Sequence, residues 1–107
     1  MTDQEKAQLA YHAGFAMQAA MICGDLKWLY PTERELEARI GEKLRGPESR
    51  FSGRFIKGCE DALTVSDRGV LQDEAWQRYG DYGRDYPGLV HVNMINVADE
   101  EFRRKGE

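Results

Sequence analysis

The sequence predicts a mainly α-helical fold, a compact bundle of four to five helices with a short strand or irregular segment near residues 89–95. Three observations predict it. Threonine–glutamate capping boxes open two segments, apolar residues recur at helical spacing in four segments, and Gly24 and Gly46-Pro47 stand where two of them end. The chain has 107 residues. At this length we expect a single helical domain, residues 1–107, whose core forms without a disulfide or metal.

The first helix is expected to lie at the centre of the bundle. Thr2 and Glu5 form a capping box, in which each side chain satisfies a free backbone N–H of the first turn. From Leu9 to Cys23 the segment is apolar on nearly every face, which is typical of a central helix, and Gly24 is expected to end it. The same apolar surface would also serve as half of a homodimer seam. Its small residues let other helices approach closely: Ala10, Ala13, Gly14, Ala16, Ala19 and Ala20.

A second helix is expected to start near Glu33, because Thr32 and Glu35 repeat the capping box. It is expected to end at Gly46-Pro47. Glu35 and Arg39 lie four residues apart with the acid first, which is the favourable order for a pair on one helix face. The apolar stripe of this helix is narrow and consists of Leu36, Ile40 and Leu44.

A third helix is expected over residues 49–63. Glycine inside a helix weakens it by up to about 1 kcal/mol, and this segment contains Gly53 and Gly58. We expect both glycines to allow close packing against the small residues of the first helix. The apolar residues that recur at helical spacing are Phe51, Phe55, Cys59 and Ala62.

A fourth helix is expected over roughly residues 71–79, with Leu71, Ala75 and Tyr79 facing inward. Residues 89–95 allow two interpretations. Their alternation of apolar and polar residues is typical of a strand, but the apolar spacing after Pro87 also fits a helix. We favour the helix, because the chain shows no evident partner strand and an unpaired edge would have to pair with a second copy. A final helix is expected over residues 97–105.

Residues that could carry catalysis or hold a metal are scattered along the chain. His12 and Cys23 lie about 16 Å apart along one helix, and Cys23 and Cys59 are the only cysteines. Structural zinc sites need ligands in close pairs, and no glycine-rich phosphate-binding motif occurs. We therefore predict that the protein is not an enzyme and takes no metal or cofactor. An enzyme that uses Cys59 or His91 remains a third hypothesis.

Charge and hydropathy narrow the range of partners. The formal net charge is −4, and both halves of the chain are mildly acidic, so no broad basic surface attracts nucleic acid or anionic lipid. The first residues lack the positive charge of a signal peptide. The longest apolar stretch, residues 13–24, is too short to span a bilayer. We expect a cytoplasmic protein with no membrane partner.

The segment YGDYGRDYPG, residues 79–88, is the strongest candidate for function. Glycine, aspartate and proline predict a loop here, and tyrosine and arginine are typical of protein-binding surfaces. We predict a small protein-binding accessory or regulatory module, of the inhibitor or adaptor type, that acts without a cofactor. The candidate partner-binding residues, which are expected to stand free in solvent, are Tyr79, Tyr82, Arg84 and Tyr86.

DNA binding is the alternative function. Two helices joined through Gly46-Pro47 resemble a helix-turn-helix in outline, and the helix over residues 49–63 would then face the bases. Several acidic residues in the same region oppose a duplex, because they weaken the attraction to phosphates. The candidate nucleic-acid contacts are Arg39, Lys43, Arg50, Arg54 and Lys57.

Overall fold

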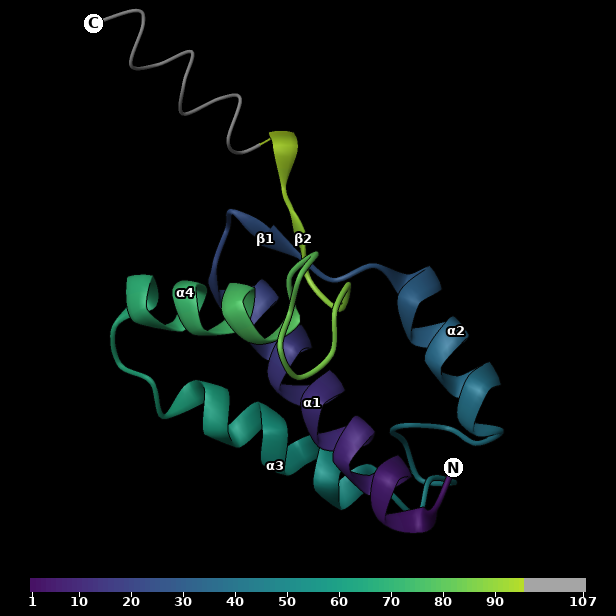
Figure 1. Ribbon diagram of the computed structural model, residues 1–107. Coiled ribbons are helices and arrows are strands. Elements are labelled where there is room, and N and C mark those ends of the chain that lie inside the picture. Colours follow the sequence, from purple (N-terminus) through teal and green to yellow (C-terminus); the bar gives the residue numbers. More distant parts are fainter. Residues whose placement is uncertain (96–107) are drawn as a thin grey trace, which may run out of the picture.

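The computed structural model describes residues 1–95, and the helix expected over residues 97–105 lies outside this range. The described part contains four helices and one two-stranded antiparallel sheet (Figure 1). The mainly α-helical prediction is therefore confirmed. In chain order the elements are α1 (Asp3–Ile22), β1 (Leu26–Lys27), α2 (Tyr30–Ile40), α3 (Ser52–Leu63), α4 (Arg68–Tyr79) and β2 (His91–Val92).

Helix α1 runs through the centre of the fold, with α3 and α4 packed against it (Figure 1). The predicted capping box is present: the backbone N–H of Glu5 donates to the Thr2 hydroxyl at 3.2 Å, and the N–H of Thr2 donates to the Glu5 carboxylate at 3.1 Å. The central position follows from apolarity on all sides of the helix. Its buried residues are Leu9, Ala10, Ala13, Gly14, Phe15, Ala16, Ala19 and Ala20.

The contact between α1 and α3 is so close that two glycines are required. A Cβ atom on Gly14 would lie 2.0 Å from the carbonyl oxygen of Phe55, and one on Gly58 would lie 2.1 Å from the carbonyl oxygen of Tyr11. The packing role predicted for Gly58 is thus confirmed. The same prediction for Gly53 is wrong, because a Cβ there would meet no described atom within 4 Å.

Helix α2 begins and ends earlier than the sequence predicts. Its N-cap is Leu29, which makes no side-chain cap hydrogen bond in the described structure, so the second capping box at Thr32 is wrong. Proline in the first turn already has the helical φ and needs no N–H there, which favours the earlier start. Gly41 then adopts a left-handed conformation (φ 76°) and ends the helix. Leu44 is buried, but it lies beyond the helix.

The expected helix-turn-helix outline is also wrong. Residues 41–51 connect α2 to α3, whereas the turn of that motif has about three to four residues. Helix α3 packs along α1 and not along α2. The connection is held by Arg45, whose guanidinium donates to both carboxylate oxygens of the buried Glu33, at 2.8 and 3.0 Å.

Within residues 89–95, residues 91–92 form strand β2 and residues 94–95 have a helical backbone, so the helical interpretation that we favoured is wrong for residues 91–92. In the antiparallel pair β1–β2, Leu26 lies opposite Val92 and Lys27 opposite His91. The partner strand β1 lies between α1 and α2, in a segment for which no strand was predicted. Helix α4 starts earlier than expected, because the Asp67 carboxylate caps it by accepting from the N–H of Val70 at 3.0 Å.

Candidate functional site

The loop over residues 80–90 is folded back onto the end of α4 by backbone hydrogen bonds. The carbonyl of Arg78 accepts from the N–H groups of Asp85 and Tyr86, each at 3.1 Å. The carbonyl of Tyr79 accepts from those of Leu89 and Val90, each at 3.0 Å. These bonds satisfy carbonyls that a helix end leaves without partners. The loop is therefore a defined structure and not a loose connection.

A salt bridge fastens the side of the loop to the same helix. Arg78 Nε lies 2.6 Å from Asp85 Oδ2, and the hydrogen bond from Arg78 lowers the pKa of the Asp85 carboxyl. The guanidinium carbon of Arg78 also lies 4.8 Å from the ring centroid of Phe15 and 5.0 Å from that of Tyr79. Arg78 thus joins the loop, α4 and the centre of α1.

Tyr79 faces inward, as expected for the fourth helix, and its proposed role as a free binding residue is wrong. Its side chain has 0% exposed surface, and its hydroxyl oxygen lies 2.7 Å from Nδ1 of His12, with which it shares a hydrogen bond. Burial raises the pKa of Tyr79. Burial, and after it the charge of Arg78, lowers the pKa of His12. Tyr79 holds the base of the loop and does not reach its surface.

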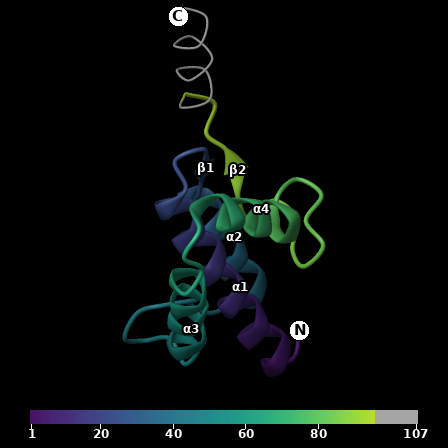
Figure 2. The same cartoon turned by 90° about the vertical axis from the view of Figure 1, so that its left-hand side faces the viewer.

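Tyr82 has the opposite environment. Its exposed fraction is 98%, and the loop that carries it stands away from the helices (Figure 2). Arg84 is also exposed, with its Nη2 3.3 Å from Oε1 of Glu74 on α4. Of the four predicted partner-binding residues, these two are open to solvent on the loop.

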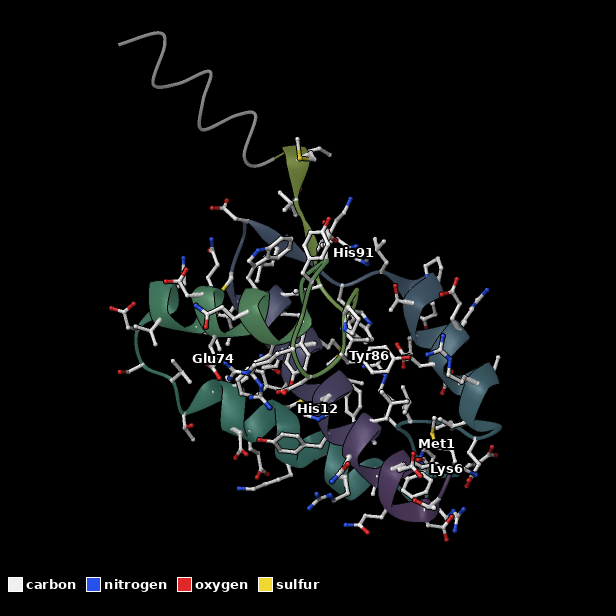
Figure 3. All side chains as sticks on the ribbon, in the orientation of Figure 1. Met1, Lys6, His12, Glu74, Tyr86 and His91 are labelled. Carbon is white, nitrogen blue, oxygen red and sulfur yellow. The ribbon has the colours of Figure 1, made fainter. Side chains whose placement is uncertain are left out.

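Tyr86 lies on the side of the loop that faces α2 (Figure 3). Arg39 of α2 donates a hydrogen bond to the Tyr86 hydroxyl, and its guanidinium carbon lies 5.8 Å from the ring centroid. The sequence predicted that Arg39 would pair with Glu35. In the described structure no ion pair joins these two residues, and Arg39 contacts Tyr86 instead. Tyr86 is half-buried and its hydroxyl is occupied by Arg39.

A groove of about 650 Å³ separates α2 from the chain over residues 86–91. This volume falls within the range of ligand-binding clefts. Among its lining residues, the sequence indicated Arg39, Tyr86 and His91 as candidates, each for a different function, because the groove forms between segments far apart in the chain. Its other walls are formed by Leu29, Pro31, Thr32, Glu35, Leu36, Pro87, Gly88, Leu89 and His91.

His91 carries an unusual feature of this groove. Its Nε2 atom is buried and has no hydrogen-bond partner within residues 1–95. Buried polar atoms are nearly always paired, because an unpaired one costs about 1–3 kcal/mol. Figure 3 shows His91 close to the loop, above Tyr86. The wall of the groove therefore contains a polar group whose bonding capacity is unused.

Two of the candidate DNA contacts are occupied by carboxylates. Arg50 donates to Asp3 at 2.9 Å and to Glu42 at 2.7 Å. Hydrogen bonds from Arg50 and then Lys6 lower the pKa of Glu42 to about 2. Lys57 lies 2.9 Å from Asp61 on the same helix. A phosphate would have to compete with these acids for both cations.

The other candidate DNA contacts come from three different parts of the chain. Arg54 stacks over the ring of Tyr11, with its guanidinium carbon 5.9 Å from the centroid. Lys43 is exposed in the connection between α2 and α3, and Arg39 points into the groove. The five residues are thus distributed over α2, the connection and α3.

The cysteines and histidines form no joint site among the described residues. The thiol of Cys23 donates to the carbonyl of Arg68 at 3.6 Å, and that of Cys59 to the carbonyl of Gly14 at 3.3 Å. Burial raises the pKa of both thiols, which disfavours the reactive thiolate. Within residues 1–95, no three His, Cys, Asp or Glu side chains lie close enough together to hold a metal ion.

Comparison with known proteins assigns this chain to no family. The sequence matches no family model, and no curated protein or solved structure is significantly similar to it. Among the described helices, none is sufficiently long and apolar to span a membrane.

Proposed function

We propose that this protein is a small binding module, of the inhibitor or adaptor type, that docks onto another protein through the 80–90 loop and acts without a cofactor. The observation that carries the proposal is Tyr82, which is 98% exposed on a loop fixed by backbone and side-chain hydrogen bonds. We place this partnership in the cytoplasm.

A fixed loop with an exposed tyrosine suits protein recognition. Binding is weakened by the entropy lost when a mobile segment becomes ordered. Here the loop is already ordered by its bonds to Arg78 and Tyr79, so little of that cost remains. Tyrosine adds a large contact area with only two side-chain torsions to restrain. Arg84, beside it on the loop, offers a charged contact at the rim.

Nucleic-acid binding has weaker support. A duplex is held mainly through contacts between basic side chains and phosphates, and Arg50 and Lys57 already pair with Asp3, Glu42 and Asp61.

The two proposed functions differ in how the binding affinity depends on salt concentration. Binding through Tyr82 should change little between 50 and about 200 mM salt, whereas a complex held by several phosphate contacts should weaken by orders of magnitude.

The proposal is tested by photocrosslinking with a benzophenone amino acid placed at the exposed position 81, next to Tyr82, in cells of the native host. We expect a defined crosslinked protein that is lost when Tyr82→Ala is introduced into the same chain. The fold should be unaffected, because exposed substitutions change the free energy of unfolding by about 0.5 kcal/mol or less.

Ile56→Ala is the matched control, because Ile56 is an exposed apolar residue on α3, away from the loop. It should leave the crosslink unchanged. A crosslink that forms equally well with Tyr82→Ala, or one lost equally with Ile56→Ala, would show that the loop is not the binding surface.

A further inference from the structure

The groove beside the loop has the length of a short peptide. Its α2 wall extends from Leu29 to Arg39, which corresponds to about 15 Å at the helical rise of 1.5 Å per residue. An extended chain covers this distance with about five residues. A long, open groove of this kind suits an extended segment of a protein better than a compact small molecule.

Part of the groove wall is apolar. Its exposed apolar surface comes from Pro31 and Pro87, whereas Leu36 and Leu89 lie behind it and are almost fully buried in the core. An apolar side chain placed here would exchange water for hydrocarbon contacts, at about 25 cal/mol for each Å² removed from water. The groove therefore favours a Leu, Ile, Met or Phe side chain at the centre of the bound segment.

The charge at one end of the groove is positive. Among the groove-lining residues of the described range, Arg39 is the one Lys or Arg. It bonds to the neutral Tyr86 hydroxyl, and within residues 1–95 it has no carboxylate at ion-pair distance. Four other arginines of this part of the chain do pair with carboxylates: Arg45, Arg50, Arg78 and Arg84.

Arg39 can therefore accept an acidic group from a partner. A guanidinium has five N–H donors, and the bond to Tyr86 uses one Nη, so donors remain for a carboxylate. Glu35, one turn earlier on α2, also lines the groove and repels a second acid. The charge pattern accordingly places a single acidic residue next to Arg39.

We propose that the groove binds an extended segment of the partner protein in which an apolar side chain packs against Pro31 and Pro87 and a neighbouring Asp or Glu pairs with Arg39. This inference rests on the proposed protein-binding function and specifies its ligand. The exposed Tyr82 and the groove then contact two different parts of one partner.

The test is selection of random 12-residue peptides, displayed on phage, against three immobilised full-length proteins: wild type, Arg39→Glu and Arg34→Glu. Arg34 is the matched control, because it lies on the same helix but stacks over Tyr30 and does not line the groove. We expect wild type and Arg34→Glu to select peptides that carry Asp or Glu within two residues of a large apolar residue. Arg39→Glu should select Lys or Arg at that position instead.

Affinities then provide a quantitative check. A selected acidic peptide, labelled with fluorescein, should bind Arg39→Glu at least about tenfold more weakly than wild type in fluorescence anisotropy. The same peptide with its acid replaced by Lys should recover affinity for Arg39→Glu. Arg39→Gln, which removes the charge without reversing it, should give an intermediate affinity, and circular dichroism should show the same helical content in every variant.

Three results would overturn the inference: no selection of peptides by the wild type, selected peptides without an acidic preference, or the same preference with Arg39→Glu as with wild type. The Tyr82 crosslink distinguishes this failure from a failure of the proposed function. If the crosslink depends on Tyr82 but the groove selects no such peptide, only the groove inference is wrong. If the crosslink is also independent of Tyr82, the protein-binding function is wrong as well.

Discussion

Two regions of this small fold are held together by different kinds of interaction. Between α1 and α3, the helix backbones approach until Gly14 meets Phe55 and Gly58 meets Tyr11, with no room for a Cβ atom. Between α4, the 80–90 loop and α2, the contacts are backbone hydrogen bonds, the Arg78–Asp85 salt bridge and the Arg39–Tyr86 pair. A groove remains open beside these polar contacts.

The two kinds of contact contribute differently to the stability of the fold and to the exposure of side chains. Close apolar packing removes surface from water on both sides and has a steep energetic response to any added atom. Polar contacts near solvent contribute less each, about 0.5–1.5 kcal/mol for a hydrogen bond, but they can hold a loop in one shape while its side chains stay accessible. The α1–α3 contact is therefore expected to dominate unfolding, and the loop to tolerate change.

The largest effect is expected from Gly58→Ala. The added methyl group would lie 2.1 Å from the carbonyl oxygen of Tyr11, and a backbone atom cannot move aside as a flexible side chain does. The two helices must separate, and we expect a loss of about 3 kcal/mol or more in the free energy of unfolding. Urea denaturation followed by circular dichroism measures this loss.

Gly53→Ala is the control on the same helix. A Cβ there meets no described atom within 4 Å, and alanine has the higher helix propensity, so stability should stay constant or rise by up to about 1 kcal/mol. Equal effects of the two substitutions would contradict the close contact of α1 with α3.

A smaller effect on stability is expected from Tyr79→Phe. This substitution tests the contact between α1 and the base of the 80–90 loop. The ring of Tyr79 packs on Phe15 of α1, with centroids 5.9 Å apart, while its hydroxyl bonds His12. Removing the hydroxyl leaves Nδ1 of His12 without this bond, and we expect a loss of about 1.5 kcal/mol. Thermal and urea unfolding should both report it.

Tyr82→Phe removes the same hydroxyl from a ring that is almost fully exposed. Its effect on the free energy of unfolding should be near zero. A Tyr79→Phe protein as stable as the Tyr82→Phe protein would show that the bond to His12 contributes nothing to the fold.

The smallest effect is expected from Asp85→Asn and depends on pH. The pKa of Asp85 is lowered in the folded protein by the hydrogen bond from Arg78. Its contribution to stability is therefore present above the ordinary carboxyl pKa of about 3.9 and is lost as the pH falls through the lowered folded value. At pH 7 we expect Asp85→Asn to be less stable than wild type by up to about 1 kcal/mol.

This difference should shrink as the pH is lowered from 7 toward 3, because the Asp85 carboxyl of the unfolded chain, whose pKa is higher than in the folded protein, takes up a proton first. Asp73→Asn is the control, since Asp73 is exposed on α4 and has no ion pair in the described structure. A difference between wild type and Asp85→Asn that is the same at both pH values would mean that the salt bridge does not stabilise the loop.

Local signals explain which parts of the fold could be predicted. The capping box at Thr2, the apolar surface of α1 and the inward spacing of Leu71, Ala75 and Tyr79 all act within a few residues, and each was read correctly. The second capping box at Thr32 has the same residues but is not used, because Pro31 and Gly41 place the ends of α2 elsewhere. Where two local signals compete, the sequence pattern does not show which one prevails.

The candidate site depended on long-range contacts. The turn residues between α4 and β2 predicted a loop, and Tyr82 and Arg84 are exposed on it as expected. Tyr79, three residues earlier, ends a helix and turns into the core instead. The groove was not predicted, because its two walls come from α2 and from residues 86–91.

Short-range chemistry in the chain was thus sufficient for the helical class and the central helix, whereas the need for glycine at position 58 and not at 53 depends on the contact with α1. The meeting of Leu26–Lys27 with His91–Val92, the burial of Tyr79 against His12 and the pairing of Arg39 with Tyr86 arose only on folding. The physical reason is the distance along the chain over which each interaction acts. Helix propensity and capping act over about four residues, whereas strand pairing, burial and a groove wall depend on residues brought together from distant parts of the chain.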